Sequence, residues 1–124
     1  MANPNIINAT TITGKTSYDT DIAVAASSIV GNAASSGKII KVNSLIIANI
    51  DGTNSADITV TLRNAAGSST YSTLASTIAV PNDATLVVIS KDTAIYLEED
   101  MSLYVLASAA GDLSATCSYE EISE

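Results

Sequence analysis

Apolar residues alternate with small polar residues along most of this chain, and clusters of turn-forming residues interrupt the alternation at short intervals. An alternation with a period of two places the apolar side chains on one face of an extended segment, and such segments separated by turns are typical of an all-β sandwich or barrel. The clearest case is 57–63, where Ile58, Val60 and Leu62 share one face. No segment has the period and caps of a long helix. We predict a single-domain antiparallel β-sandwich, Ig-like or jelly-roll-like, of about eight or nine strands.

The other predicted strands follow the same alternation. They cover residues 6–13, one or two segments within 21–30, and residues 38–50, 71–80, 86–89, 94–97, 103–109 and 113–119. We expect the last two to form a hairpin around Ala110-Gly111-Asp112. A chain of 124 residues is typical of one domain, so we predict one domain over 1–124, in which residues 1–10 form an extended arm.

Two predicted strands are apolar on both faces. In 38–50 one face carries Ile40, Val42, Ile46, Ala48 and Ile50, and the other carries Leu45 and Ile47. One interpretation is a central strand that a crossing loop or the arm covers. The other is a contact with identical subunits or a larger assembly. On the second interpretation, the predicted partner-contact residues are Leu45, Ile47 and Val88, with Ile6 and Ile7 of the arm.

Composition excludes several kinds of chemistry. The chain has no His, Phe, Trp or Gln, while Ala, Ser and Thr number 19, 17 and 14. Without His there is no Ser/His/Asp or Cys/His nucleophile and no ordinary zinc site. Five Tyr leave few aromatic platforms for ligand clefts or single-stranded nucleic acid. We therefore expect a non-enzymatic protein with no cofactor.

Charge narrows the range of partners. Thirteen acidic and five basic residues give a net charge of -8, which repels nucleic acid and anionic lipid surfaces. With 47% hydrophobic residues the chain is not of the disordered acidic class. Its apolar runs are too short to span a bilayer, and its opening lacks the pattern of an export signal. We expect neither a nucleic-acid nor a membrane partner.

Two acidic groups could supply oxygen atoms to a calcium ion. One is Glu98-Glu99-Asp100, and the other is formed by Asp51, Asn54 and Asp57. Calcium takes about six to eight oxygens, and neither group has the spacing of an EF-hand. We interpret both as solvated turns and predict no metal site.

The remaining reactive side chains have structural explanations. Adjacent Glu98 and Glu99 would point to opposite faces of a strand, and a glycosidase needs two carboxyl groups across one sugar. Lysine beside serine at 36–38 and 90–91 is expected by chance in a chain this rich in Ser. Cys117 alternates with Ala115 and Tyr119, which predicts a small core residue rather than a nucleophile. We predict no catalytic residues.

Several stretches together resemble a known group of proteins. They are MANPNIIN at 1–8, SGKIIKVNSLIIANIDG at 36–52, IYLEEDMSL at 95–103 and SYEEI at 118–122. On these, the whole chain resembles small virion structural proteins of tailed bacteriophages, especially those of marine cyanobacteria. In such proteins the turn at Glu99-Asp100 usually reads Gly-Asp, so Glu99 leaves the turn geometry open. The resemblance implies a β-sandwich in a virus particle and carries no active site.

Within such a particle, acidic charge and small size favour a protein added to the outside of an assembled shell, since proteins that face packaged DNA are more often basic. We expect a capsid decoration or cement protein that docks on the major capsid protein as a homo-oligomer, such as a trimer. It would be made in the host cytoplasm and reside on the capsid surface. The alternatives are a neck or tail component, and a fibre-associated glycan-binding or adhesion module that would need exposed aromatic residues, for which Tyr18 and Tyr71 are candidates.

Overall fold

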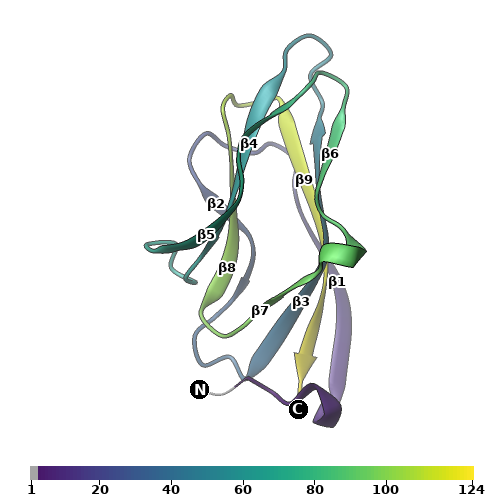
Figure 1. Cartoon of the computed structure of the whole chain (residues 1–124), viewed down its shortest axis with the longest axis vertical. Helices are drawn as coiled ribbons and strands as arrows, with labels where there is room; N and C mark the ends of the chain where they lie inside the picture. Colours follow the sequence, from purple (N-terminus) through teal and green to yellow (C-terminus); the bar gives the residue numbers. More distant parts are fainter. Residues whose placement is uncertain (1–2) are drawn as a thin grey trace.

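The computed structural model describes residues 3–124, which form two antiparallel β-sheets packed face to face (Figure 1). The first sheet contains β1 (Thr11–Asp19), β9 (Leu113–Ser123), β3 (Lys38–Asn49), β6 (Thr85–Ile89) and β7 (Ile95–Leu97). The second contains β2 (Ser27–Asn32), β8 (Met101–Ala107), β4 (Ala56–Arg63) and β5 (Thr70–Val80). In this part of the chain the helical elements are two single turns, η1 (Ile6–Asn8) and η2 (Lys91–Thr93). The predicted all-β sandwich is confirmed.

The strands pair in a nested order, from the two ends of the chain toward its middle. The first strand β1 pairs with the last strand β9, β2 pairs with β8, β3 pairs with β6 and β7, and β4 pairs with β5. In addition, β9 lies beside β3 and β8 lies beside β4, which completes the orders β1-β9-β3-β6 and β2-β8-β4-β5. This is the double-sheet arrangement of a jelly roll, so the topology decides between the two predicted kinds of sandwich.

The predicted hairpin between the last two strands is wrong. Strand β8 belongs to the second sheet and β9 to the first, and residues 108–112 cross between the sheets. At this crossing the Ser108 backbone N donates to Asp57 O (2.9 Å), and the Ile50 backbone N donates to Asp112 O (2.7 Å). Alternation correctly identified the buried face of both strands, but it does not identify the neighbouring strand.

Aliphatic side chains from the inner faces of both sheets form the core. The largest completely buried ones are Ile22, Leu45, Ile47, Ile58, Ile89, Leu97, Leu103, Leu113, Val42, Val60, Val80 and Val105. No helix in residues 3–124 is both long enough and apolar enough to cross a membrane. Burial of Ile58 and Val60 confirms the inward face predicted for 57–63.

A β-bulge in β3 reverses the predicted faces of the second half of this strand. The register between β3 and β9 shifts between Val42 and Ser44, which leaves one extra residue on β3. Such an insertion moves every following side chain to the opposite face. Leu45 and Ile47 are therefore 0% exposed in the core, whereas Ile46 lies on the outer face. The prediction of Leu45 and Ile47 as partner contacts is corrected, because their side chains do not reach the surface.

Residues 3–10 lie along the lower end of the sandwich in Figure 1 and do not project as an extended arm. The Asn3 Nδ2 donates to Glu98 Oε1 (2.6 Å), and the Asn5 backbone N donates to Glu124 Oε1 (3.3 Å). The strand predicted at 6–13 is correspondingly displaced, since residues 6–8 form η1 and β1 begins at Thr11. Residues 1–2 of the predicted arm lie outside the described residues.

The bulge predicts opposite effects of truncating adjacent residues in β3. Leu45→Ala should lower the free energy of unfolding by about 2–5 kcal/mol, because it leaves a cavity in the core. Ile46→Ala should cost no more than about 1 kcal/mol, because this side chain is only partly buried. Urea unfolding followed by circular dichroism measures both values. Equal losses, or a larger loss at Ile46, would contradict the placement of the bulge.

Candidate interaction surface

No pocket opens among residues 3–124, and in the same residues no group of three or more Cys, Asp or Glu side chains is arranged to hold a metal ion. Cys117, the single cysteine, is 0% exposed in β9. Burial raises the pKa of its thiol to about 12, so the thiol stays protonated at neutral pH and is a poor nucleophile.

The acidic turn between β7 and β8 joins separate segments of the fold. The Glu99 backbone N donates to Asn3 Oδ1 (3.3 Å), and the Ala65 backbone N donates to Asp100 Oδ1 (3.1 Å). Asp100, with a φ of 64°, is the left-handed residue of the turn, so Glu99 in place of glycine needs no unusual backbone. The two carboxylate oxygens of Glu99 are buried and find no hydrogen-bond partner among the described residues. The three acidic residues form a structural turn and not a gathered set of ligands.

The second acidic group also forms a turn. Asp51 Oδ1 accepts from the Thr53 backbone N (2.8 Å), and Asp51 Oδ2 accepts from Asn54 Nδ2 (3.1 Å). Asp57 lies apart from this turn, in β4. Asp51 thus stabilises the loop after β3 in the way that Asx residues commonly stabilise turns.

Four loops meet at the upper end of the sandwich in Figure 1, and each contains one aspartate. This loop end comprises residues 20–26, 50–55, 81–84 and 108–112, which hold Asp21, Asp51, Asp83 and Asp112. Hydrogen bonds connect the loops: the Gly111 backbone N donates to Asp21 Oδ1 (2.7 Å), and Asn82 Nδ2 donates to Gly52 O (3.1 Å). Asp19 and Asp57, on the strands that lead into and out of these loops, add two further carboxylates.

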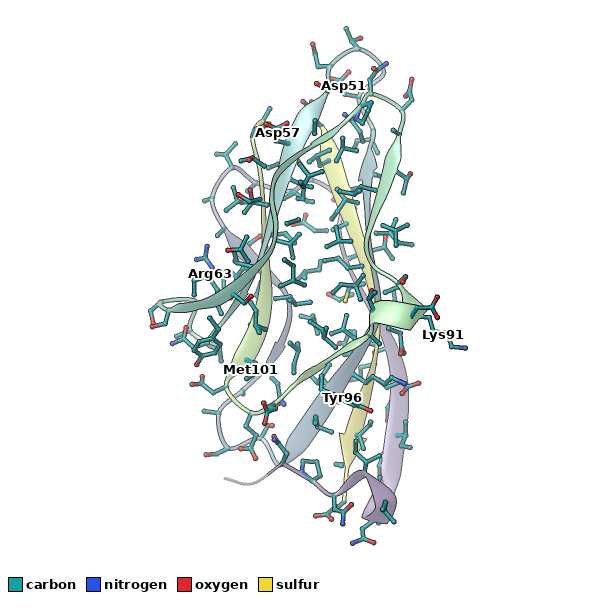
Figure 2. All side chains as sticks on the ribbon, in the orientation of Figure 1. Asp51, Asp57, Arg63, Lys91, Tyr96 and Met101 are labelled. Carbon is teal, nitrogen blue, oxygen red and sulfur yellow. The ribbon has the colours of Figure 1, made fainter. Side chains whose placement is uncertain are left out.

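The loop end carries no basic residue. The five basic residues lie elsewhere: Lys15 in β1, Lys38 and Lys41 in the first half of β3, Arg63 at the far end of β4, and Lys91 in η2. Figure 2 shows Asp51 and Asp57 toward the loop end, with Arg63 and Lys91 nearer the middle of the molecule. The chain is therefore most negative at one end.

Burial and neighbouring carboxylates together raise the pKa of one aspartate at the loop end. Partial burial raises the pKa of Asp112, and its hydrogen bond with Asp51 and the charges of Asp51 and Asp21 raise it further. The pKa of Asp51 is lowered, mainly by the hydrogen bond from the Thr53 backbone N and also by the Asn54 side chain. Asp112 therefore takes up a proton before Asp51 as the pH falls.

One row of side chains crosses the outer face of the first sheet just below the loop end. Tyr18 of β1 is opposite Thr116 of β9, Thr116 is opposite Ile46 of β3, and Ile46 is opposite Val87 of β6. Tyr18 is 71% exposed and Val87 is 55% exposed. These four residues are named the outer row, which spans three strand spacings, or about 14 Å.

The predicted contact residues lie in three different environments. Leu45 and Ile47 are in the core, as described above. Val88 is partly buried and packs against the core, while its neighbour Val87 faces outward. Ile6 and Ile7 are exposed on η1, by 44% and 92%, at the opposite end from the loops. The structure therefore does not bring the five residues together.

Sequence reasoning missed the outer row as a unit. The alternation in 38–50 places Ile46 on the face opposite the predicted contacts Leu45 and Ile47, and Tyr18 is a candidate only for binding sugar. The available signal was the apolar character of both faces in 45–48 and 86–89, but the register of four strands was needed to align these residues.

Two lysines surround one glutamate in the lower half of the first sheet. Lys15 Nζ and Lys38 Nζ lie 3.2 and 3.3 Å from Glu121 Oε1. Partial burial of Glu121 opposes its ionisation, but the two ammonium groups outweigh this effect and lower its pKa. Lys15, Lys38 and Glu121 belong to β1, β3 and β9, so these ion pairs connect three neighbouring strands of the first sheet.

Comparison with known proteins gives a fold and no family. No protein-family model matches the chain, and no curated protein sequence matches it. Solved structures with a similar fold include Bacillus endospore appendages, described as a novel family of disulfide-linked pili, at 13% identity and a TM-score of 0.53 over 99% of this chain and 96% of that one. The VP2 subviral particle of infectious bursal disease virus is 12% identical, with a TM-score of 0.47 over 94% of this chain and 34% of that one. At 13% identity the likeness to the appendage protein is one of fold.

The lysine–glutamate cluster predicts a pH-dependent contribution to stability. Because the pKa of Glu121 is lowered in the folded chain, its ion pairs stabilise the fold above the pKa of the unfolded chain, and this contribution is lost as the pH falls through the folded pKa. Glu121→Gln should lower the free energy of unfolding by about 0.5–1 kcal/mol at pH 7, and the difference should be smaller at pH 3 than at pH 7. Urea unfolding at the two pH values measures this effect. Glu120→Gln is the control, and a pH-independent loss in Glu121→Gln would contradict the ion-pair explanation.

Proposed function

We propose that this chain is a non-enzymatic structural protein of a bacteriophage virion, and specifically a capsid decoration or cement protein that docks on the major capsid protein and stabilises the head. The observation that carries the proposal is the outer row, an uncovered apolar strip on a sandwich that shows no pocket in its described part. Apolar strips with polar borders are typical of protein–protein contacts. The resemblance of the whole chain to small phage virion proteins is the reason for proposing a virus particle as its location.

The reactive side chains support a role without catalysis. The Cys117 thiol is buried and protonated, and the carboxylates of Asp51 and Asp100 in the acidic turns accept hydrogen bonds from backbone N atoms. A catalyst would need such groups to converge where a substrate can bind.

We further propose that the protein acts as a homo-oligomer, such as a trimer, with many symmetric copies on one particle. The fold is shared with an appendage protein that assembles into disulfide-linked pili. Since Cys117 is completely buried, an assembly of this chain would rest on non-covalent contacts. Ile6 and Ile7 on η1 remain proposed contact residues for such an assembly, together with the partly buried Val88.

The alternative in the same particle is a neck or tail component, which would use the same kind of surface. A fibre-associated glycan-binding module is less well supported. Tyr18 and Tyr71 are 71% and 51% exposed, but they lie on β1 and β5, which belong to different sheets. Two aromatic rings on separate sheets do not form one sugar-binding platform.

Particle location tests the proposal. An antibody raised against the purified chain, coupled to gold, is applied to virions of the phage that encodes the chain, and the virions are imaged by electron microscopy. We expect gold over the whole shell, because a decoration protein is present in many symmetric copies. Virions that are stripped of the chain and then incubated with it serve as the control for specific labelling. Gold confined to the neck, tail or fibres would contradict decoration, and unlabelled virions would contradict a virion role.

A further inference from the structure

We propose that the outer row and the loop end together form a docking surface for a positively charged protein, which contacts the row through apolar side chains and the aspartates through lysine or arginine side chains. The inference deepens the proposed function and rests on it, because it names the docking surface of the chain and the chemistry of its partner.

The apolar part of this surface is more exposed than the centre of the same sheet at its lower end. At the lower end of the same sheet, Ile39 and Ile122 lie opposite each other and are only 7% and 3% exposed. At the upper end, Tyr18 and Val87 are more than half exposed. The chain thus covers the centre of this sheet at its lower end, where Ile12 of the edge strand β1 is exposed, and leaves the outer row at the upper end open to contact.

The charged part borders the row directly. Along each of the four strands, the loop end begins within four residues of the outer row. Ile50, which is 58% exposed beside Asp51, continues the apolar surface into the loops. An apolar strip is thereby edged by carboxylates on its loop side, which is the arrangement of an apolar contact with a polar rim.

Charge complementarity identifies the partner as positive. Six aspartates without a lysine or arginine give this end a negative potential, which attracts a basic surface and slows the approach of an acidic one. A second copy of the chain docked with the same surface would bring the two sets of aspartates together, so the partner on this surface is a different protein. Nucleic acid and anionic lipid are disfavoured for the same reason.

Hydrogen bonds within the loop end fix the positions of two carboxylates that could accept a cationic side chain from a partner. Asp21 and Asp51 are fixed by hydrogen bonds from the Gly111 and Thr53 backbone N atoms, at 2.7 and 2.8 Å. Asp112 lies next to Asp51 and experiences its charge. A lysine or arginine side chain between these carboxylates would relieve their repulsion without rearranging the loops.

Incorporation of tagged variants into particles tests the inference. The chain is expressed with a peptide tag during infection, and its amount in purified particles is compared between variants. Asp51→Asn with Asp112→Asn should reduce incorporation by about tenfold, because two charges of the docking surface are removed. The control is Asp92→Asn with Glu98→Gln, which removes two charges outside the loop end and should stay within about twofold of the unchanged chain.

A second pair of variants tests the apolar part and does not depend on charge. Val87→Thr keeps a β-branched residue in β6 and should reduce incorporation by about threefold or more, because apolar contact area is lost. Ile12→Thr is the matched control, since Ile12 is 60% exposed on β1 at the other end of the strand from Tyr18. Urea unfolding of each purified variant shows whether it folds as the unchanged chain does.

The outcomes separate this inference from the proposed function. Equal incorporation of loop-end and control variants would overturn the inference and leave a virion role intact. Loss of the loop-end variant together with gold on the neck or tail would support the inference and overturn decoration. If the unchanged chain is absent from particles, carbodiimide cross-linking in the infected-cell lysate decides: cross-links from Asp51, Asp83 or Asp112 to lysines of one protein support the inference, and cross-links confined to the other end overturn it.

Discussion

The pairing of β3 with β9 is the contact on which the rest of the structure depends. These are the longest paired strands of the first sheet, and β1 joins β9 on one side while β6 and β7 join β3 on the other. Because β3 lies in the first half of the chain and β9 at its end, this contact cannot form from local sequence alone. Pairing across such separations closes large loops and is typical of slowly folding β proteins. The nested jelly-roll order is consistent with this pairing, because strands from the first half of the chain pair with strands from the second half, as β1 does with β9 and β2 with β8.

Two buried asparagines secure the two ends of the core that this pairing creates. Asn32 Nδ2 donates to Lys38 O (2.9 Å) and Leu97 O (3.0 Å), and Asn49 Nδ2 donates to Asn54 O (3.0 Å) and Val80 O (2.9 Å). Asn32 is the last residue of β2 and Asn49 the last residue of β3, and each side-chain amide donates hydrogen bonds to carbonyl groups of two different segments. A buried carbonyl that loses its donor costs about 1–3 kcal/mol, so an apolar residue at either position would destabilise the crossing of the chain between sheets. Small polar residues in this sequence are therefore part of the core and not merely its border.

The sequence predicted the fold class because apolar and polar residues alternate wherever a strand is regular and buried on one side. It was accurate at Ile58 and Val60, and it failed in three places for three different physical reasons. The bulge before Ser44 moved Leu45 and Ile47 to the inner face. The alternation of apolar residues does not indicate where a strand contains one extra residue. Strand β1 is an exposed edge that includes Gly14 and Lys15, so it lacks the apolar alternation of an inner strand. Strand pairing, and with it the outer row, depends on register between distant segments, which one sequence does not contain.

The size of the outer row limits how this protein can act. Full burial of a large apolar side chain contributes about 1.5–3 kcal/mol, and the row holds three such side chains that are already partly buried. Association itself costs roughly 4–15 kcal/mol in lost freedom of motion, so the row alone would not hold one copy on its partner. On the proposed docking surface, the aspartates of the loop end would mainly speed the encounter with a positively charged partner and favour it over others, rather than add much affinity. A contact of this size becomes strong when several copies are linked and bind together, because each further contact then forms at a high effective concentration. The proposed docking surface and the proposed homo-oligomer thus depend on each other. A single copy would bind too weakly through this surface, and linked copies would gain affinity only on a partner that repeats in a lattice.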